Sequence, residues 1–164
     1  MGSGKSAVGK LLARQVHAPF YDSDAEIEAR TGVDIPYIFE KEGEAGFRQR
    51  EREVIEILTA MEPVVIATGG GAILLPENRA HLAARGVVVY LRTSIRQQVG
   101  RVQHGRHRPL LHDVDPEVRL TELMEERTPL YEGTADIVVA TDGRKVQQVV
   151  DQILHTIQDT GLGH

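Results

Sequence analysis

The sequence contains no cysteine, no surplus of basic side chains and no long apolar run. Without cysteine there is no disulfide, no thiolate metal site and no cysteine nucleophile. The absence of about 18 consecutive apolar residues argues against a membrane-spanning helix. The first ten residues lack the apolar core of a secretion signal. The net charge of −5, from 19 basic and 24 acidic side chains, disfavours nucleic-acid binding. We therefore expect a cytoplasmic protein that binds neither membrane nor nucleic acid.

The length of 164 residues fits one domain, and no repeat, linker or low-complexity segment divides it. Four short apolar segments predict strands at Pro19–Asp22, Val64–Thr68, Val87–Leu91 and Asp136–Ala140. The middle two are continuous runs of Val, Ile, Ala and Leu. Such runs are typical of strands covered on both faces, as in a parallel sheet.

Helical patterns lie between these segments. Near each end of the chain, apolar residues share one helical face. They are Val8, Leu11, Leu12 and Val16, and then Val146, Val149, Val150, Ile153, Leu154 and Ile157. Pro36, Pro76 and Pro116 can each occupy the first turn of a further helix. The alternation of strands and helices predicts an α/β fold, a three-layer parallel sheet with helices on both faces.

The N-terminal segment Met1-Gly2-Ser3-Gly4-Lys5-Ser6 matches the end of a phosphate-binding loop. Glycines let backbone N–H groups turn toward phosphate oxygens, and a helix beginning near Lys5 directs its positive end at them. Lys5 can reach the β- and γ-phosphates, and the Ser6 hydroxyl can bind Mg²⁺. The alternative is a glycine-rich terminus with a chance Gly-Lys-Ser.

Two acids, Asp22 and Asp24, follow the first predicted strand. They point the same way if the strand continues. One could hold Mg²⁺ through water, and the other could take or orient a hydroxyl proton. The alternative is that Asp24 or Ser23 caps the next helix.

Three glycines, Gly69, Gly70 and Gly71, follow the second strand, which suggests close approach of the backbone to a ligand or else a loose turn. The segment Phe47–Arg52 could border a pocket for an anionic substrate, although its spacing alone favours a solvated helix. Between Arg92 and Arg108 the chain has five arginines and no acid. This is a solvated face or a site for a phosphate tail, and we expect a lid at about residues 102–116.

Together these segments resemble shikimate kinases. The resemblance rests on the order and spacing of Gly4-Lys5-Ser6, Phe20-Tyr21-Asp22-Ser23-Asp24, Gly46-Phe47-Arg48, Thr68-Gly69-Gly70-Gly71, Arg108-Pro109-Leu110-Leu111 and Glu126-Arg127-Thr128-Pro129-Leu130-Tyr131. It implies a nucleoside monophosphate kinase-like fold with a five-stranded parallel sheet and a lid. It also implies transfer of the ATP γ-phosphate to the 3-hydroxyl of shikimate, in chorismate biosynthesis.

The resemblance further implies roles for individual residues. Asp24 activates the shikimate hydroxyl, Arg48 and Arg127 hold its carboxylate, and Phe39, Phe47, Gly69, Gly70 and Gly71 line its site. Lys5 and the lid residue Arg108 act on the transferring phosphate. The nucleotide contacts are Gly2, Ser3, Gly4, Lys5, Ser6, Ala7, Arg101, Arg108 and Arg144. Ser6 binds Mg²⁺, with Asp22 helping through water. We expect a monomer.

The first glycine of the phosphate-binding motif, and the strand that normally precedes it, would fall before Met1. We therefore expect that the natural protein begins upstream and that the chain as printed is marginally stable or inactive. Other readings are a kinase of the same fold for another small molecule, such as gluconate, and a non-catalytic nucleotide-binding remnant. A nucleic-acid-binding module at Arg92–Arg108 is disfavoured, because that segment lacks aromatic residues.

Overall fold

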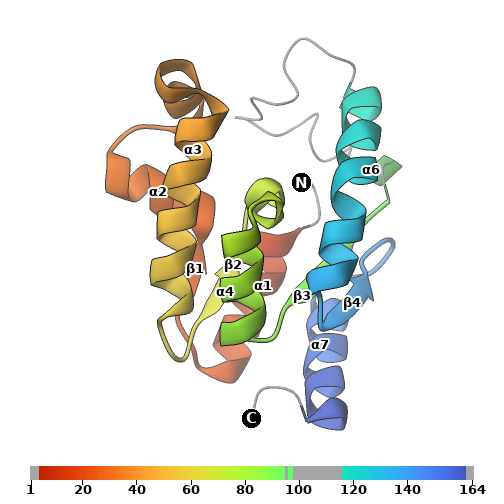
Figure 1. Ribbon diagram of the computed structural model, residues 1–164. Coiled ribbons are helices and arrows are strands. Elements are labelled where there is room, and N and C mark those ends of the chain that lie inside the picture. The colour runs from red at the N-terminus through yellow and green to blue at the C-terminus, as the bar shows by residue number, and fades with distance from the viewer. Residues whose placement is uncertain (1–3, 95, 98–115, 162–164) are drawn as a thin grey trace.

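The computed structural model describes residues 4–94, 96–97 and 116–161 (Figure 1). The helices are α1 (Lys5–Val16), α2 (Ser23–Thr31), α3 (Ile35–Thr59), α4 (Pro76–Arg85), α6 (Pro116–Thr134) and α7 (Val146–Thr160), with a 3₁₀ helix η1 (Gly70–Leu74). The strands are β1 (Phe20–Asp22), β2 (Val65–Ala67), β3 (Val89–Arg92) and β4 (Ile137–Ala140). All four predicted strands are confirmed, each with slightly shorter or shifted bounds.

The strands form two parallel pairs. β1 pairs with β2, with Tyr21 opposite Ile66, and β3 pairs with β4, with Tyr90 opposite Val138. In the part of the chain that the structure describes, no hydrogen-bonded strand joins β2 to β3. The α/β class is therefore confirmed, and the described residues supply four of the five strands that the resemblance implies.

The helices begin where the sequence predicts. Pro36 lies in the first turn of α3, and the Asp34 carboxylate accepts the Tyr37 N–H there at 3.0 Å. α4 and α6 also begin with proline. Inside α3, Gly43 has a φ of 72°, in the left-handed region, and this residue kinks the helix. Of the helices in the described ranges, none is both long and apolar enough to span a membrane.

The apolar residues form two separate clusters. One joins α1, β4 and α7 through Val8, Val139, Val150 and Ile153, and the other joins α2 to α3 through residues that include Ile27 and Leu58. In Figure 1, α4 lies in front of β2 and α1 lies behind it. α1 packs on β1, β2 and α7, so it links the two strand pairs.

The predicted apolar face of α1 is only partly correct. Val8 is buried, whereas Val16, in the last turn, is 43% exposed. Val16 borders a cavity between the strand pairs and is not packed in a core.

Candidate active site

Ser6 and Asp22 meet where α1 begins and β1 ends. The Ser6 hydroxyl donates to Asp22 Oδ2 at 3.0 Å. The other oxygen, Oδ1, accepts the backbone N–H groups of Asp24 at 2.9 Å and of Ala25 at 3.2 Å. Asp22 therefore caps α2, and the expectation that Ser23 or Asp24 is the cap is wrong, because the helix already begins at Ser23. Asp22 thus combines capping with a carboxylate oxygen beside Ser6.

These two oxygens fit a magnesium site. The described residues contain no set of three or more His, Cys, Asp or Glu side chains placed to hold a metal. Mg²⁺ in phosphate-transfer sites needs few protein ligands, since water and phosphate oxygens complete its octahedron. Gly4, with a φ of 77°, precedes α1, whose first turn carries no acid. No acid of α1 itself therefore balances the positive end of this helix, and the nearby negative charge is that of Asp22, which accepts from Ser6.

Asp24 lies in the first turn of α2, against the glycine segment after β2. Strand β1 ends at Asp22, so the shared strand face expected for the two acids does not occur. The buried Ser23 hydroxyl accepts the Gly69 N–H at 3.2 Å and holds the two segments together. A Cβ added to Gly69 would lie 2.8 Å from Asp24 Oδ1. Glycine at this position is what lets the backbone pass the carboxylate.

Arg48 reaches the same place from α3. A Cβ on Gly71 would overlap its guanidinium group. The Arg48 side chain is 11% exposed and lies over the Phe47 ring, with Cζ 5.1 Å from the ring centroid. The Phe47 ring lies 4.9 Å from that of Phe39. The spacing-based preference for a solvated helix at Phe47–Arg52 is therefore wrong for one face, where Phe47 and Glu51 are buried, and holds for the other, where Gln49 is exposed.

Glu51, one helical turn after Arg48, is the most deeply buried acid of the site. It is 0% exposed, and its Oε1 accepts from Arg48 Nη1 at 2.8 Å. Burial raises the pKa of its carboxyl to about 7, although Arg48 acts in the opposite direction. The nearby charge of Asp24 raises the pKa further, while that of Arg127 lowers it. Glu51 is therefore poised to exchange a proton near neutral pH.

Helix α6 contributes Arg127 and Tyr131, one turn apart. Arg127 is 3% exposed, and its Nε has no hydrogen-bond partner within the described residues. A buried guanidinium group with an N–H donor still available favours the binding of an anionic ligand. The Tyr131 hydroxyl donates to the Gly70 carbonyl at 2.6 Å, and its ring lies 4.9 Å from that of Tyr90. Burial raises the pKa of Tyr131, so it stays protonated as a donor.

The structure brings together most of the predicted site residues. Asp24, Arg48, Gly69 and Gly71 lie in direct proximity, and Arg127 is close enough to act electrostatically on Glu51 beside them. Ala7 is in the first turns of α1. Arg144 lies apart, where its guanidinium donates to the carbonyls of Ala140 at 3.1 Å and Gln148 at 3.2 Å. Gly2, Ser3, Arg101, Arg108 and nearly all of the predicted lid lie outside the described residues.

Sequence reasoning missed three residues that build the site, Ser23, Glu51 and Tyr131. Glu51 carries a weak signal, because it stands three residues after Arg48 and an acid at that spacing pairs with arginine on a helix. Tyr131 belongs to a segment that carries the family resemblance, but its partner is 61 residues away. No local sequence pattern predicts the contact between Tyr131 and Gly70.

The comparisons with known proteins decide the family. A model of the shikimate kinase family matches residues 1–158. The chain belongs to the shikimate kinase family. It is 54% identical over 158 residues to the shikimate kinase of Pseudomonas entomophila, covering 96% of this chain and 92% of the relative. The shikimate kinase of Halorhodospira halophila is also 54% identical, with 96% and 89% covered.

Solved shikimate kinases have the same fold. The enzyme from Acinetobacter baumannii, in complex with shikimate, matches with a TM-score of 0.95 and 44% identity, over 98% of this chain and 89% of the other. The enzyme from Aquifex aeolicus matches with a TM-score of 0.83 and 39% identity, over 100% and 95%. The expected fold, the kinase class and the ATP-dependent phosphorylation of shikimate are thereby confirmed at the level of the family.

Proposed function

We propose that this chain phosphorylates the 3-hydroxyl of shikimate with Mg-ATP at the carboxyl ends of β1 and β2. One observation carries the proposal. Asp24, Arg48 and the glycine segment converge on one spot, and the Ser6–Asp22 pair lies directly beside it at the start of α1. An acceptor site and a phosphate site are thus adjacent, and adjacency is what phosphoryl transfer needs most.

The acceptor side suits a hydroxylated carboxylic acid. Arg127 is buried and Arg48 is partly buried, and in this proposal the two cations hold its carboxylate, since guanidinium binds carboxylate through two parallel hydrogen bonds. Phe39 and Phe47 wall the ring of the substrate, and Gly69, Gly70 and Gly71 admit its hydroxyls close to the backbone. Asp24 orients the 3-hydroxyl and accepts its proton as the phosphoryl group arrives.

The nucleotide side is built on the start of α1. Gly2, Ser3, Gly4, Lys5 and Ala7 cradle the phosphates in this proposal, with Lys5 on the transferring group. Mg²⁺ is held by the Ser6 hydroxyl, with Asp22 acting through water, and it supplies charge neutralisation on the phosphate oxygens. Arg101, Arg108 and Arg144 complete the contacts that the family resemblance implies. A monomer working in the cytoplasm is part of the same proposal.

The first experiment is shikimate-dependent ADP release by the purified 164-residue chain with Mg-ATP. Turnover that requires shikimate, with gluconate giving none, supports the proposal. Turnover with other hydroxy acids and none with shikimate contradicts the substrate. No turnover, with nucleotide binding retained, favours a non-catalytic remnant.

Two substitutions then test the assigned roles. Asp24→Asn is expected to abolish most turnover, and near-normal turnover would show that Asp24 takes no part in the reaction.

Arg127→Ala is expected to raise the KM for shikimate far more than the KM for ATP. Arg119→Ala, on the same helix but in a solvent-exposed pair with Glu122, is the matched control. An equal loss for both substrates in Arg127→Ala would make that residue structural.

A further inference from the structure

The carbonyl groups at the end of η1 accept hydrogen bonds from the first turn of α4. The Asn78 amide donates to the Ala72 carbonyl at 2.9 Å. Arg79 Nη1 donates to the carbonyls of Ile73 at 2.8 Å and Leu74 at 3.1 Å. The last carbonyls of a helix have no partner inside it, so these donors satisfy groups that η1 itself cannot. Helix α4 is therefore bonded to the end of η1 as well as packed against it.

The Asn78 side chain makes its bond in the interior of the protein. It is 0% exposed, and its Oδ1 has no hydrogen-bond partner within the described residues. Burying an amide costs free energy that one hydrogen bond offsets only in part. An apolar side chain of similar size would fill the same space without that cost. The amide is therefore explained by its bond to the Ala72 carbonyl and not by packing alone.

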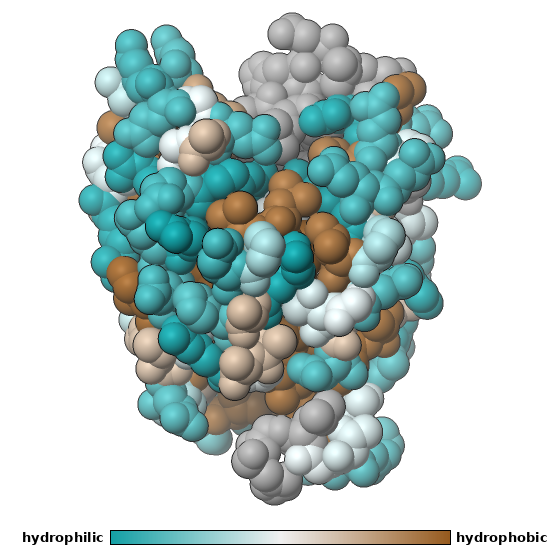
Figure 2. Space-filling model, viewed as in Figure 1, coloured by the Kyte–Doolittle hydropathy of each residue, from teal (hydrophilic) through white to brown (hydrophobic). Residues whose placement is uncertain are grey.

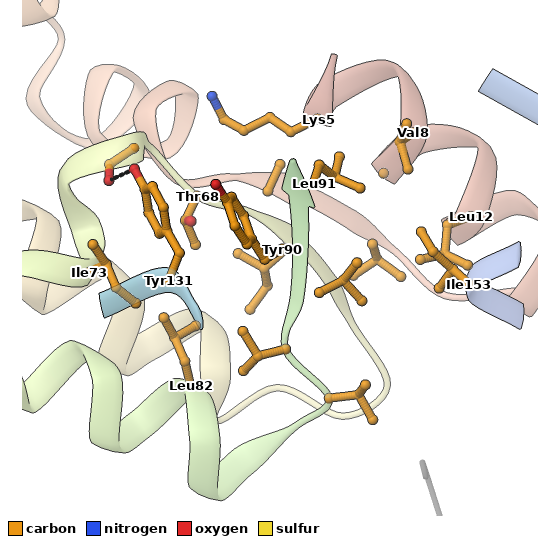
Figure 3. Close-up of a pocket in the computed structure, with 18 of the residues that line it drawn as sticks. Lys5, Val8, Leu12, Thr68, Ile73, Leu82, Tyr90, Leu91, Tyr131 and Ile153 are labelled. Atoms are coloured by element: carbon orange, nitrogen blue, oxygen red, sulfur yellow. Dashed lines mark hydrogen bonds between the residues drawn. The ribbon is translucent and has the colours of Figure 1, made fainter. Parts of the chain in front are cut away.

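The beginning of η1 is held by two other helices. The Gly69 N–H donates to the Ser23 hydroxyl of α2 at 3.2 Å. The Tyr131 hydroxyl of α6 donates to the Gly70 carbonyl at 2.6 Å, the bond drawn as a dashed line in Figure 3. Gly71 follows these two attachments and precedes those of α4. Because the backbone is fixed on both sides, Gly71 cannot shift without breaking hydrogen bonds.

The position of Gly71 matters because Arg48 lies directly against it. A Cβ on Gly71 would overlap the Arg48 guanidinium, so backbone and side chain are in close contact. The same guanidinium is paired with Glu51 at 2.8 Å. A displacement of η1 would therefore either press on Arg48 or leave a gap beside it, and both would change the direction of its N–H donors.

We propose that Asn78 and Arg79 fix the place of η1 and thereby position Arg48 for the substrate carboxylate. This inference rests on the proposed function, in which Arg48 binds that carboxylate. The two α4 residues act through the backbone of η1 and are positioning residues. Their loss should weaken binding of the acceptor and spare the nucleotide, which the proposed function places at the start of α1.

The first test removes the two donors by Asn78→Leu and Arg79→Leu. Each variant is expected to raise the KM for shikimate about fivefold and to leave the KM for ATP within about twofold. Arg79→Lys keeps a cationic donor and is expected to recover part of the loss. Arg79 lies at a half-buried position, so Arg79→Leu carries the test if Asn78→Leu does not fold.

Arg85→Leu is the matched control at the other end of the same helix. Arg85 Nη1 also donates to two oxygens, the Glu56 carbonyl at 3.1 Å and the Thr59 hydroxyl at 3.0 Å, but both belong to α3. This variant is expected to lower the melting temperature and to change neither KM. A rise of the KM for shikimate in Arg85→Leu equal to that in Arg79→Leu would overturn the inference, because general loss of stability would explain both.

A second test by NMR needs neither turnover nor shikimate. The Ala72 N–H donates to the Gly69 carbonyl at 3.1 Å, so its hydrogen exchange reports on η1, and the Nε–H signal of Arg48 reports on the guanidinium. In the Asn78 and Arg79 variants, exchange at Ala72 is expected to accelerate at least about tenfold and the Arg48 signal to shift. Unchanged exchange and an unchanged signal would overturn the inference. These changes in a chain that does not bind shikimate would support the positioning of Arg48 and contradict the proposed function.

Discussion

At the scale of single residues, Glu51 has the least ordinary environment in the site. It is fully buried, paired with Arg48 at 2.8 Å, and close enough to Asp24 and Arg127 to feel both charges. Glu51 thus has no access to solvent and lies among the groups that we assign to substrate binding. We infer that Glu51 positions Arg48 and that its protonation state sets how strongly Arg48 is held.

The free energy of unfolding should depend on pH because of Glu51. Its folded pKa of about 7 lies above the ordinary value of 4.5, so the folded protein keeps a proton that the unfolded chain has released. The free energy of unfolding should therefore fall as the pH rises from about 5 to above 7. The full shift corresponds to roughly 3 kcal/mol. Urea titrations across this range measure the slope.

In Glu51→Gln this fall should largely disappear, because the neutral amide does not titrate. The variant should also raise the KM for shikimate more than the KM for ATP, since Arg48 loses its partner. Glu53→Gln, on the exposed side of α3, is the matched control and should keep the wild-type slope. An unchanged slope in Glu51→Gln would show that another group causes the pH dependence.

At the scale of elements, the glycine segment before α4 is where three helices meet. α2 approaches Gly69 through Asp24 and Ser23, α3 approaches Gly71 through Arg48, and α6 approaches Gly70 through Tyr131. Figure 2, which shows the molecule from the same side as Figure 1, has apolar residues gathered in the middle of the visible face and hydrophilic residues around them. The segment therefore sets the spacing between elements that carry different parts of the site.

Gly71→Ala tests this close packing. The added methyl group would overlap the Arg48 guanidinium and displace it from its place beside Glu51. The KM for shikimate should rise by about tenfold or more, as expected when a bidentate contact worth over 1 kcal/mol is misplaced. Gly133→Ala, where an added Cβ meets nothing within 4 Å, should leave the KM unchanged. Equal kinetics in the two variants would contradict the packing argument.

Tyr131→Phe tests the tether between α6 and the glycine segment. It removes the hydrogen bond to the Gly70 carbonyl but keeps the ring against Tyr90. The free energy of unfolding should fall by roughly 1 kcal/mol, and kcat should fall more than in a surface control. Tyr37→Phe, at a position that is 47% exposed, is that control. A loss of stability with unchanged kinetics would mean that the tether serves folding alone.

The site could be predicted from the sequence where its residues are contiguous in the chain. Gly4, Lys5 and Ser6 form one helix start, and Asp22 and Asp24 flank one strand end, so local rules identify them. Glu51 could not be predicted, because its burial depends on the glycine segment that packs over α3. The strands were predictable as apolar runs, but their division into two pairs depends on pairing between distant segments.

At the scale of the whole molecule, the two strand pairs anchor two separate apolar clusters. The cluster containing Ile27 and Leu58 lies on the β1–β2 side, and the cluster containing Val139 and Val150 lies on the β3–β4 side. Helix α1 packs against elements of both sides. The cavity lies between the pairs, so few apolar contacts there couple one cluster to the other. Unfolding of the two clusters, each with its strand pair, should therefore be only weakly cooperative.

Hydrogen exchange at increasing urea concentration should reveal two opening units. Amides of α3 should share one opening free energy, and amides of α7 should share another, with a difference of at least about 1 kcal/mol. A single value for both helices would show that the packing of α1 on both sides is enough to couple the clusters.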